Sequence, residues 1–255
     1  MEFALLFLPL LASITSGFFG KYIGDRNSEI ITSLFVSIAA LLSLIIFYQV
    51  VVNGYENNVV IATWINSGTL DVNWSIKVDA LSSVMLVVVT LVSSLVHIYS
   101  IGYMSHDPHK ARFMAYLSLF TFAMLTLVTS DNFLQLFFGW EGVGLCSYFL
   151  IGFWFKKDSA NAAAIKAFVV NRVGDFGFAL GIFLIFYLFG TVNYSEVFEQ
   201  IPNIIDKELL FLGIHIKAID LICILYLLEL WVNQHKFFYT HGYLTLWKVL
   251  HLYLH

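Results

Sequence analysis

The sequence predicts an all-α, polytopic bundle of transmembrane helices, and two observations carry that prediction. The chain of 255 residues is 60% hydrophobic and 12% charged, with a mean hydropathy of +0.83, whereas a soluble domain has about 45–50% apolar and about 25% charged residues. Apolar runs of roughly 20 residues also recur, the length that crosses a hydrocarbon core of about 30 Å. No soluble fold of this length could bury so much apolar surface, so we expect six or seven spans.

Each apolar run fits the length of one span. The first begins at Phe3 with only Glu2 before it. Because it lacks a basic leading region and an A-x-A cleavage pattern, we interpret it as a retained helix rather than a signal peptide. The expected spans are Phe3–Gly20, Ile30–Asn53, Ala80–Met104, Phe113–Ser130, Asn132–Trp154, Ala163–Gly190 and, least regular, Leu209–Trp231.

Two connections are long, Gly54–Asp79 and Thr191–Lys207. Their alternating and amphipathic patterns are typical of segments that lie on the membrane surface. The other connections are short, so no soluble domain fits between the spans.

Positive charge predicts the orientation, because cytoplasmic loops collect Lys and Arg. The loops after the second, fourth and sixth spans are mainly acidic and hold only Lys77, Lys207 and Lys217. We therefore expect the N-terminus outside and the odd-numbered loops in the cytoplasm or matrix. Those odd loops contain Lys21, Arg26, Lys110, Arg112, Lys156, Lys157 and Lys166.

Several functional classes are excluded by what the sequence lacks. The net charge of −4 is spread over loops without a basic stripe, which argues against a nucleic-acid partner. Cys146 and Cys223 both lie in apolar runs, so neither a disulfide framework nor a CxxC metal site is available. No nucleotide-binding glycine loop or zinc spacing appears, and the glycines of Gly174–Gly181 indicate close helix packing instead.

Glu141 is a candidate site residue near the middle of the fifth span. A charged side chain in the hydrocarbon zone costs about 2.5–3.5 kcal/mol on insertion scales, so it persists mainly where it faces other helices or a wet cavity. Removal from water favours the neutral carboxyl, which could take up and release a proton. A protonated glutamate that only holds two helices together is the alternative.

Arg172 and Asp175 are three residues apart on the sixth span, which places them on one helical face within pairing distance. They form either a self-neutralising pair that eases insertion or a pair whose contact changes during function. Lys166, one to two turns earlier, could join them, although we favour a side chain that reaches the membrane surface.

His97 in the third span could relay protons through its imidazole. A lone histidine beside Ser93, Ser94 and Tyr99 is more often a packed, hydrogen-bonded residue.

Two segments then point to a family. The run FFGWEGVGLCSYFLIGFWFKKDSANAAAIKAFVVNRVGDFGFALG, Phe137 to Gly181, resembles the largest antiporter-like membrane subunit of respiratory complex I, which is the L subunit of NADH:quinone oxidoreductase in bacteria and chain 5 of NADH dehydrogenase in mitochondria. The run HIYSIGYMSHDPHKARFMAYLSLFTFAMLTLVTSDN, His97 to Asn132, is similar to the same subunit. The resemblance covers about residues 1–225.

The resemblance implies roles for the candidate residues. Glu141 matches the family's mid-membrane glutamate, and Arg172 and Asp175 match its NRxGD motif. It implies proton translocation in the bacterial inner membrane or, alternatively, the mitochondrial inner membrane, with other complex I membrane subunits as partners. No cofactor is expected in this chain, because NADH, FMN, iron–sulfur clusters and quinone belong to partner subunits. It also implies two inverted five-helix repeats behind extra N-terminal helices.

Three regions follow from this resemblance. Residues 1–112 are expected to form N-terminal helices and a surface loop, and residues 113–225 part of the first repeat, so the antiporter-like fold is truncated within that repeat. From Tyr226 the sequence departs from the family's pattern, and residues 226–255 are expected to be a frameshifted tail.

The choice of synonymous codons gives a reason to expect the frameshift. Codons allowed for Leu227–His235 can be read in another frame as IGAMGKSA, and codons allowed for Thr240–Leu254 as TWLPDAMEGPTPVS, which are the family's continuations. Four of the eight histidines also lie in the last 30 residues, and we interpret them as a consequence of the altered frame rather than as a metal site.

Three functions are therefore considered: a truncated complex I subunit, a subunit of a multi-subunit sodium/proton antiporter with the same fold, and a product that inserts but neither assembles nor pumps.

Overall fold

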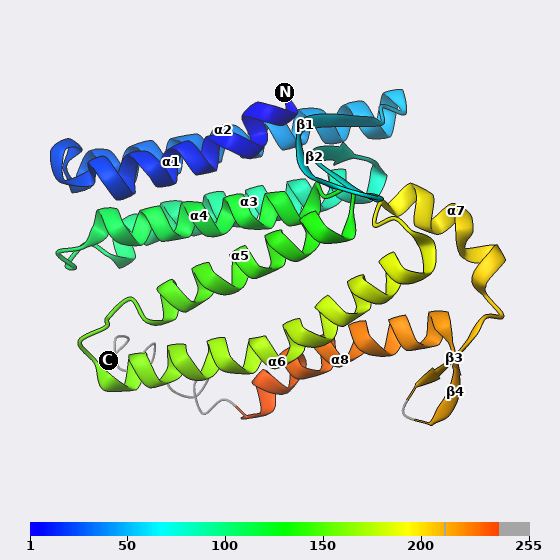
Figure 1. Cartoon of the computed structure of the whole chain (residues 1–255). Helices are drawn as coiled ribbons and strands as arrows, with labels where there is room; N and C mark the ends of the chain where they lie inside the picture. The colour runs from blue at the N-terminus through cyan, green and yellow to red at the C-terminus, as the bar shows by residue number, and fades with distance from the viewer. Residues whose placement is uncertain (212, 240–255) are drawn as a thin grey trace. The chain divides into compact units, whose positions relative to one another are not determined.

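Eight helices and two β-hairpins form the part of the chain that the computed structural model describes, residues 1–211 and 213–239, with side chains described as far as residue 229 (Figure 1). Six helices are long and apolar enough to cross a membrane, which confirms the polytopic fold class. They are α1 (Glu2–Ile23), α2 (Asp25–Asn53), α3 (Ala80–Tyr103), α4 (Lys110–Val128), α5 (Phe133–Ile151) and α6 (Asp158–Phe189).

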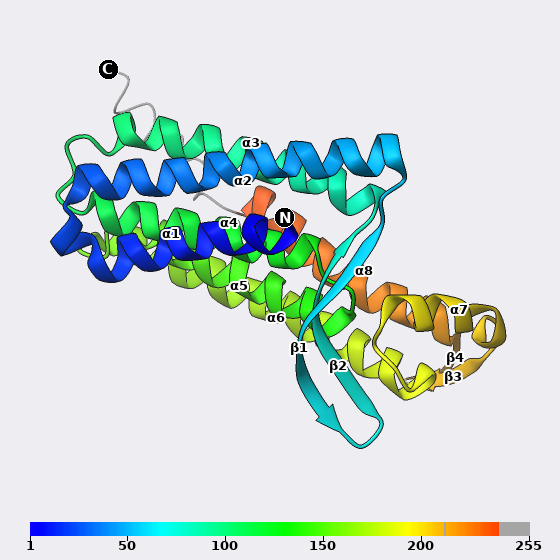
Figure 2. The same ribbon diagram turned by 90° about the horizontal axis from the view of Figure 1, so that it is seen from above.

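The chain divides into two compact units, Met1–Leu150 and a second that begins at Ile151. In the first unit α2 packs against α1, α3 and α4, and Figure 2 shows these helices side by side. Hydroxyl groups cross between them, because Ser43 and Thr90 join α2 to α3 at 2.7 Å and Ser16 of α1 donates to the Ala111 carbonyl of α4 at 2.7 Å. Such bonds contribute about 0.6 kcal/mol each between membrane helices.

A β-hairpin separates α2 from α3. Strand β1 (Asn57–Ser67) pairs antiparallel with β2 (Leu70–Val78) around a turn at Gly68, whose φ is +61°. The alternating pattern in this segment is therefore the period of a strand. From the sequence alone, the segment was expected only to lie on the membrane surface. Ile76 and Val78 of β2 pack into a buried cluster with helical residues of α1 to α4.

The second unit contains α6, α7 (Tyr194–Ile204), the hairpin of β3 (Glu208–Phe211) and β4 (Ile214–Lys217), and α8 (Ala218–Tyr239). The amphipathic segment predicted at residues 191–207 forms α7. The expected seventh span, Leu209–Trp231, is wrong at its start, because residues 209–211 and 213–217 belong to the hairpin and the helix begins at Ala218. Apolar and polar side chains alternate along Ile214–Lys217, as in a strand, and Gly213 has a φ of +82°. Both features favour a turn between two strands here.

Glycines of α6 allow α8 to approach closely, as the sequence analysis predicted. A Cβ atom added at Gly177 would lie 2.9 Å from Leu228 Cδ2, and one at Gly181 would lie 3.2 Å from the Tyr226 ring. A Cβ atom added at Gly174 would lie 3.4 Å from Glu229, which is 4% exposed. Small residues let helix backbones come close together in a membrane, so this stripe holds α6 and α8 as one pair. Residues 240–255, with three of the tail's histidines, lie outside the described part of the chain.

Candidate functional site

The first turn of α5 is fixed by side chains that bond to β2. Asn132 precedes the helix, and its Oδ1 accepts the Gln135 backbone N–H at 2.7 Å, as an N-cap side chain does. Gln135 is fully buried, and its amide exchanges two bonds with the Ser75 backbone, at 3.0 Å and 2.7 Å. Asn132 also donates to the Asn73 carbonyl at 2.9 Å. The edge of β2 thus anchors the helix that carries Glu141.

Aromatic and charged groups strengthen this anchor. Phe138 of α5 contacts Trp64 and Trp74 of the hairpin, with ring centroids 5.6 Å and 4.9 Å away. Lys77 of β2 forms an ion pair with Asp131 at 3.2 Å, just before α5. Phe138 lies within one turn of Glu141 and Asp131 within three, so the hairpin sets the axial position of that carboxyl group.

Two glycines of α5 allow this helix to approach α4 closely. A Cβ atom at Gly139 would lie 2.7 Å from the backbone of Leu127, and one at Gly142 would lie 3.2 Å from the Ala123 side chain. Residues in a helix turn by about 100° each, so Glu141 is rotated about 200° from Gly139. The carboxyl group therefore points away from α4.

The exposure of Glu141 agrees with this direction. Its side chain is only partly buried within the chain, and α5 has the smallest buried share of the six spans, at 17%. The structure places Glu141 near the middle of α5, as expected, and its side chain is only partly covered by the described part of the chain.

Arg172 and Asp175 form the predicted pair on α6. Arg172 Nη1 lies 3.6 Å from Asp175 Oδ2, with side chains 44% and 8% exposed. The guanidinium also lies 4.5 Å above the Phe168 ring, a favourable cation–π distance. Since Gly174 and Gly177 face α8, Arg172 is rotated about 160° from Gly174 and lies on the far side of the helix.

His97 is held by hydrogen bonds that terminate at backbone carbonyls. It is fully buried, with Nδ1 2.7 Å from the Ser93 carbonyl and Nε2 3.0 Å from Ser118 Oγ. Only a protonated Nδ1 can bond to a carbonyl, so Nε2 accepts from the Ser118 hydroxyl. Thr121 donates to the Leu117 carbonyl and receives a bond from the Ser93 hydroxyl.

Both chains of hydrogen bonds end at a main-chain oxygen, that of Ser93 or that of Leu117, so among the described residues neither leads a proton onward. The geometry favours the packed histidine over the proton relay, the second of the two interpretations of the sequence.

We predict that His97→Leu lowers the free energy of unfolding by about 2 kcal/mol, because it leaves the Ser118 hydroxyl and the Ser93 carbonyl without their partner. Equilibrium unfolding of the purified chain in mixed detergent measures this loss. Ser118→Ala, which removes one bond and leaves the Nδ1 bond intact, should cost about half as much. Equal stability of His97→Leu and the parent chain would contradict this role.

Lys166 lies on the exposed side of α6, before Arg172. The two cysteines are unbridged, with Cys146 buried and Cys223 exposed. Among the described residues, no group of three or more His, Cys, Asp or Glu side chains is placed to hold a metal ion.

Comparison with known families matches two stretches of the chain. Residues 64–114 match the N-terminal model of NADH-ubiquinone oxidoreductase (complex I) chain 5, and residues 130–234 match the transmembrane model of NADH:quinone oxidoreductase and Mrp antiporters. The second match contains Glu141, Arg172 and Asp175. The chain belongs to the chain 5/subunit L family of complex I. Its second match ends inside the segment 226–255 for which we expect a frameshift.

Individual relatives agree with this membership. The chain is 54% identical over 227 residues to NADH-ubiquinone oxidoreductase chain 5 of Triticum aestivum, and 48% identical over 221 residues to NADH-quinone oxidoreductase subunit L of Rickettsia bellii. These alignments cover 88% and 87% of the chain but 33% and 34% of the relatives. The chain therefore spans about a third of the length of the curated relatives it matches.

Solved structures share the fold at low identity. The Mrp complex of Dietzia matches with a TM-score of 0.74 and 19% identity, over 91% of this chain and 23% of the other. An archaeal membrane-bound sulfane sulfur reductase matches with a TM-score of 0.74 and 18% identity, over 90% of this chain and 44% of the other. The chain is a multi-pass membrane protein with an antiporter-like fold.

The anchor at β2 is the part of the site that sequence reasoning missed. A signal was present, because Asn132 followed three residues later by Gln135 is the spacing of a helix N-terminus. The bonds from that turn to the Ser75 and Asn73 backbone depend on tertiary pairing, which has no sequence signature.

Proposed function

We propose that this chain supplies the N-terminal helices and part of the first repeat of the L-type subunit of proton-translocating NADH:quinone oxidoreductase. The observation that carries this proposal is 54% identity over 227 residues to a chain 5 protein. As in the sequence-based expectation, NADH, FMN, iron–sulfur clusters and quinone would be bound by partner subunits, and this chain would contribute to proton movement.

Glu141 is the proposed proton carrier. Its carboxyl group lies on a helix whose axial position is set by the hairpin, on the face turned away from α4. When protonated it is neutral and inexpensive to keep in the membrane, and when ionised it attracts a proton or a cation. This alternation is the charge change that a proton path needs.

The contact between Arg172 and Asp175 is proposed to change when a conformational or electrostatic signal arrives. An ion pair at 3.6 Å with one partner 44% exposed is weak enough to open and close. The pair would thus act as a switchable ion pair on the proton path.

The sodium/proton antiporter is the weaker alternative. Likeness to the Mrp complex rests on 19% identity, which supports a common fold, whereas identity to complex I subunits is near 50%.

Affinity purification tests the proposal. An affinity-tagged chain, extracted from its native membrane in mild detergent, should retain other complex I membrane subunits, identified by mass spectrometry. Retention of antiporter subunits instead would replace the proposal with the alternative, and a chain recovered alone would identify a product that inserts without assembling.

In a complex in which residues 1–225 continue in frame into the rest of a relative's subunit, Asp175→Asn is predicted to lower proton translocation only about two- to threefold. Arg172 keeps its contact with Phe168 and its solvated side, and loss of a partly exposed pair costs about 0.5 kcal/mol. The loss of proton translocation is measured as the number of protons that inverted vesicles take up per NADH oxidised. Complete loss would mean that Asp175 carries protons itself.

A further inference from the structure

A buried polar cluster, formed by Ser28, Glu29 and Ser33, lies in the first turns of α2. These side chains belong to residues that are 1%, 5% and 7% exposed. Figures 1 and 2 show that the turn between α1 and α2 and the turn between α3 and α4 lie at the same end of these helices. The cluster lies at that end, and the proton path proposed above uses none of its groups.

Three helices meet at this cluster and remove it from water. A Cβ atom added at Gly20 of α1 would lie 2.8 Å from the Ala111 Cβ atom of α4 and 3.6 Å from Ser28 Oγ. Glu29 follows Ser28 directly, and the charge that acts most strongly on its carboxyl group is that of Lys110, in the first turn of α4. The start of α4 therefore lies beside Glu29.

Oxygen atoms of this cluster lack hydrogen-bond partners. Within the part of the chain that the structure describes, Ser28 Oγ, Glu29 Oε1 and Ser33 Oγ are shielded from solvent and take part in no hydrogen bond. A buried polar atom without a partner costs about 1–3 kcal/mol, and a charged one costs more. Protonation relieves this cost at Glu29, because the neutral carboxyl gains an O–H. Ser33, one turn later on the same face, can accept from it.

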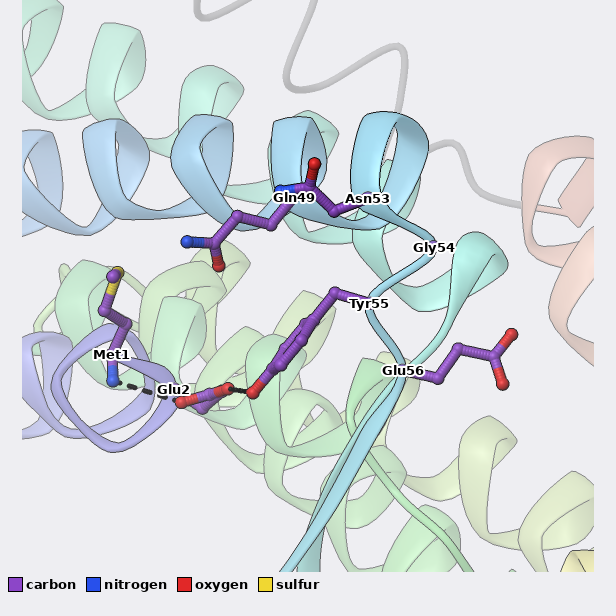
Figure 3. Close-up of a pocket in the computed structure, with 7 residues that line it drawn as sticks. All are labelled: Met1, Glu2, Gln49, Asn53, Gly54, Tyr55 and Glu56. Atoms are coloured by element: carbon purple, nitrogen blue, oxygen red, sulfur yellow. Dashed lines mark hydrogen bonds and ion pairs between the residues drawn. The ribbon is translucent and has the colours of Figure 1, made fainter.

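Glu2, at the start of α1, shows the opposite situation (Figure 3). Its Oε1 accepts from the Tyr55 hydroxyl at 2.7 Å, and its Oε2 accepts from the Met1 amino group at 3.1 Å. Donors engage both oxygens, so the ionised form of Glu2 is satisfied as it stands. Glu29 Oε1 has no such donor among the described residues, so hydrogen bonds do not fix the charge state of Glu29.

Nearby charges oppose the effect of burial on Glu29. Lys110 and Arg26 favour the ionised carboxylate, whereas Asp25 and removal from water favour the neutral form. These opposing effects leave both charge states accessible. The charged or titratable side chains that the packed helices bring toward this end are Asp25 and Arg26 of α2, Lys110 and Arg112 of α4, Lys21 of α1 and His97 of α3.

We propose that Glu29 is a second proton-binding carboxyl group, which takes up protons from water on the side of the turn between α1 and α2. Asp25, one turn earlier on the same helical face, is exposed, so a proton has to cross only about 6 Å, the rise of four residues. A hydronium ion gives up the proton, and an O–H bond forms on the Glu29 carboxylate. The binding needs neither Glu141 nor a partner subunit.

Infrared spectroscopy of the purified full chain in lipid nanodiscs tests this site. Between about pH 5 and pH 8 exposed carboxyl groups are mostly ionised, so the carbonyl stretch of a carboxylic acid reports buried groups. We expect the parent to gain and lose such a band reversibly over this range, and Glu29→Gln to lack it. Subtraction of the two spectra cancels any band of Glu141. A difference spectrum without a pH-dependent carbonyl band would overturn the proposal.

Glu199→Gln is the matched control for this substitution, because it makes the same chemical change at an exposed residue of α7. Its spectra should equal those of the parent. Loss of the band in both variants would mean that the band does not belong to Glu29.

Lys110→Met tests the site with Glu29 left in place. Removal of this cation should let the carboxylic-acid band persist to a pH about one unit higher, since an adjacent opposite charge favours the ionised form. Lys156→Met, the same change at an exposed residue between α5 and α6, should leave the pH dependence unchanged. Equal pH dependence of Lys110→Met and the parent would place the titrating group away from the start of α4.

Discussion

Glu141→Gln is expected to lower proton translocation at least about tenfold in a complex in which residues 1–225 continue in frame into the rest of a relative's subunit. Glutamine keeps the shape of the side chain but cannot bind and release a proton, and loss of a positioned proton-transfer group typically costs about 10²–10⁴-fold. Quinone reduction that is coupled to pumping should fall with it. Acidification of inverted membrane vesicles, followed while NADH is oxidised, measures both quantities in one preparation.

The matched control for this substitution is Glu199→Gln, which makes the same chemical change on the exposed surface of α7. It should pump like the parent. Pumping by Glu141→Gln at the parental rate, in vesicles that contain equal amounts of assembled complex, would exclude Glu141 from the proton path.

Gly139→Leu is expected to lower the free energy of unfolding by about 3 kcal/mol. The new Cβ atom would meet the Leu127 Cα and N atoms at 2.7 Å, and a backbone neighbour cannot rotate away as a side chain can, so α5 must move off α4. The same shift moves Glu141, which lies two residues later. Unfolding of the purified chain by a denaturing detergent, monitored by circular dichroism, measures the loss.

Gly102→Leu provides the comparison for this steric argument. Gly102 lies near the end of α3 and has no atom within 4 Å of an added Cβ, so the same substitution should change stability by less than about 0.5 kcal/mol. If the two variants are equally stable, then contact between α4 and α5 does not constrain the position of Glu141.

The helices of this chain were predictable because each span has to match the length and apolarity of the hydrocarbon core by itself. A span needs a fixed length and nearly continuous apolarity, so the start of α3 at Ala80 and the end of α2 at Asn53 were predicted to the residue. The same reasoning failed at residues 209–217, where an apolar but alternating segment forms a hairpin. Hydropathy alone does not distinguish a strand from the first turns of a helix.

The candidate residues could be predicted from their residue types, because a charged side chain inside a span is costly and therefore rare. The pairing of Arg172 with Asp175 followed from their spacing of three. Two features depended on tertiary contacts that no local pattern specifies. The bonds of Gln135 to Ser75 join segments 60 residues apart, and the role of His97 was decided by the direction of its bonds to Ser118 and Ser93.

The proposed proton path depends on a carboxyl group at position 141 that gains and loses a proton during turnover. Infrared difference spectroscopy of the assembled complex, recorded before and after NADH addition, observes such a group directly through the carbonyl stretch of a protonated carboxylic acid. We expect a difference band in this region that is present in the parent and in Glu199→Gln and absent in Glu141→Gln. Identical difference spectra for all three proteins would show that the protonation of Glu141 does not change during turnover.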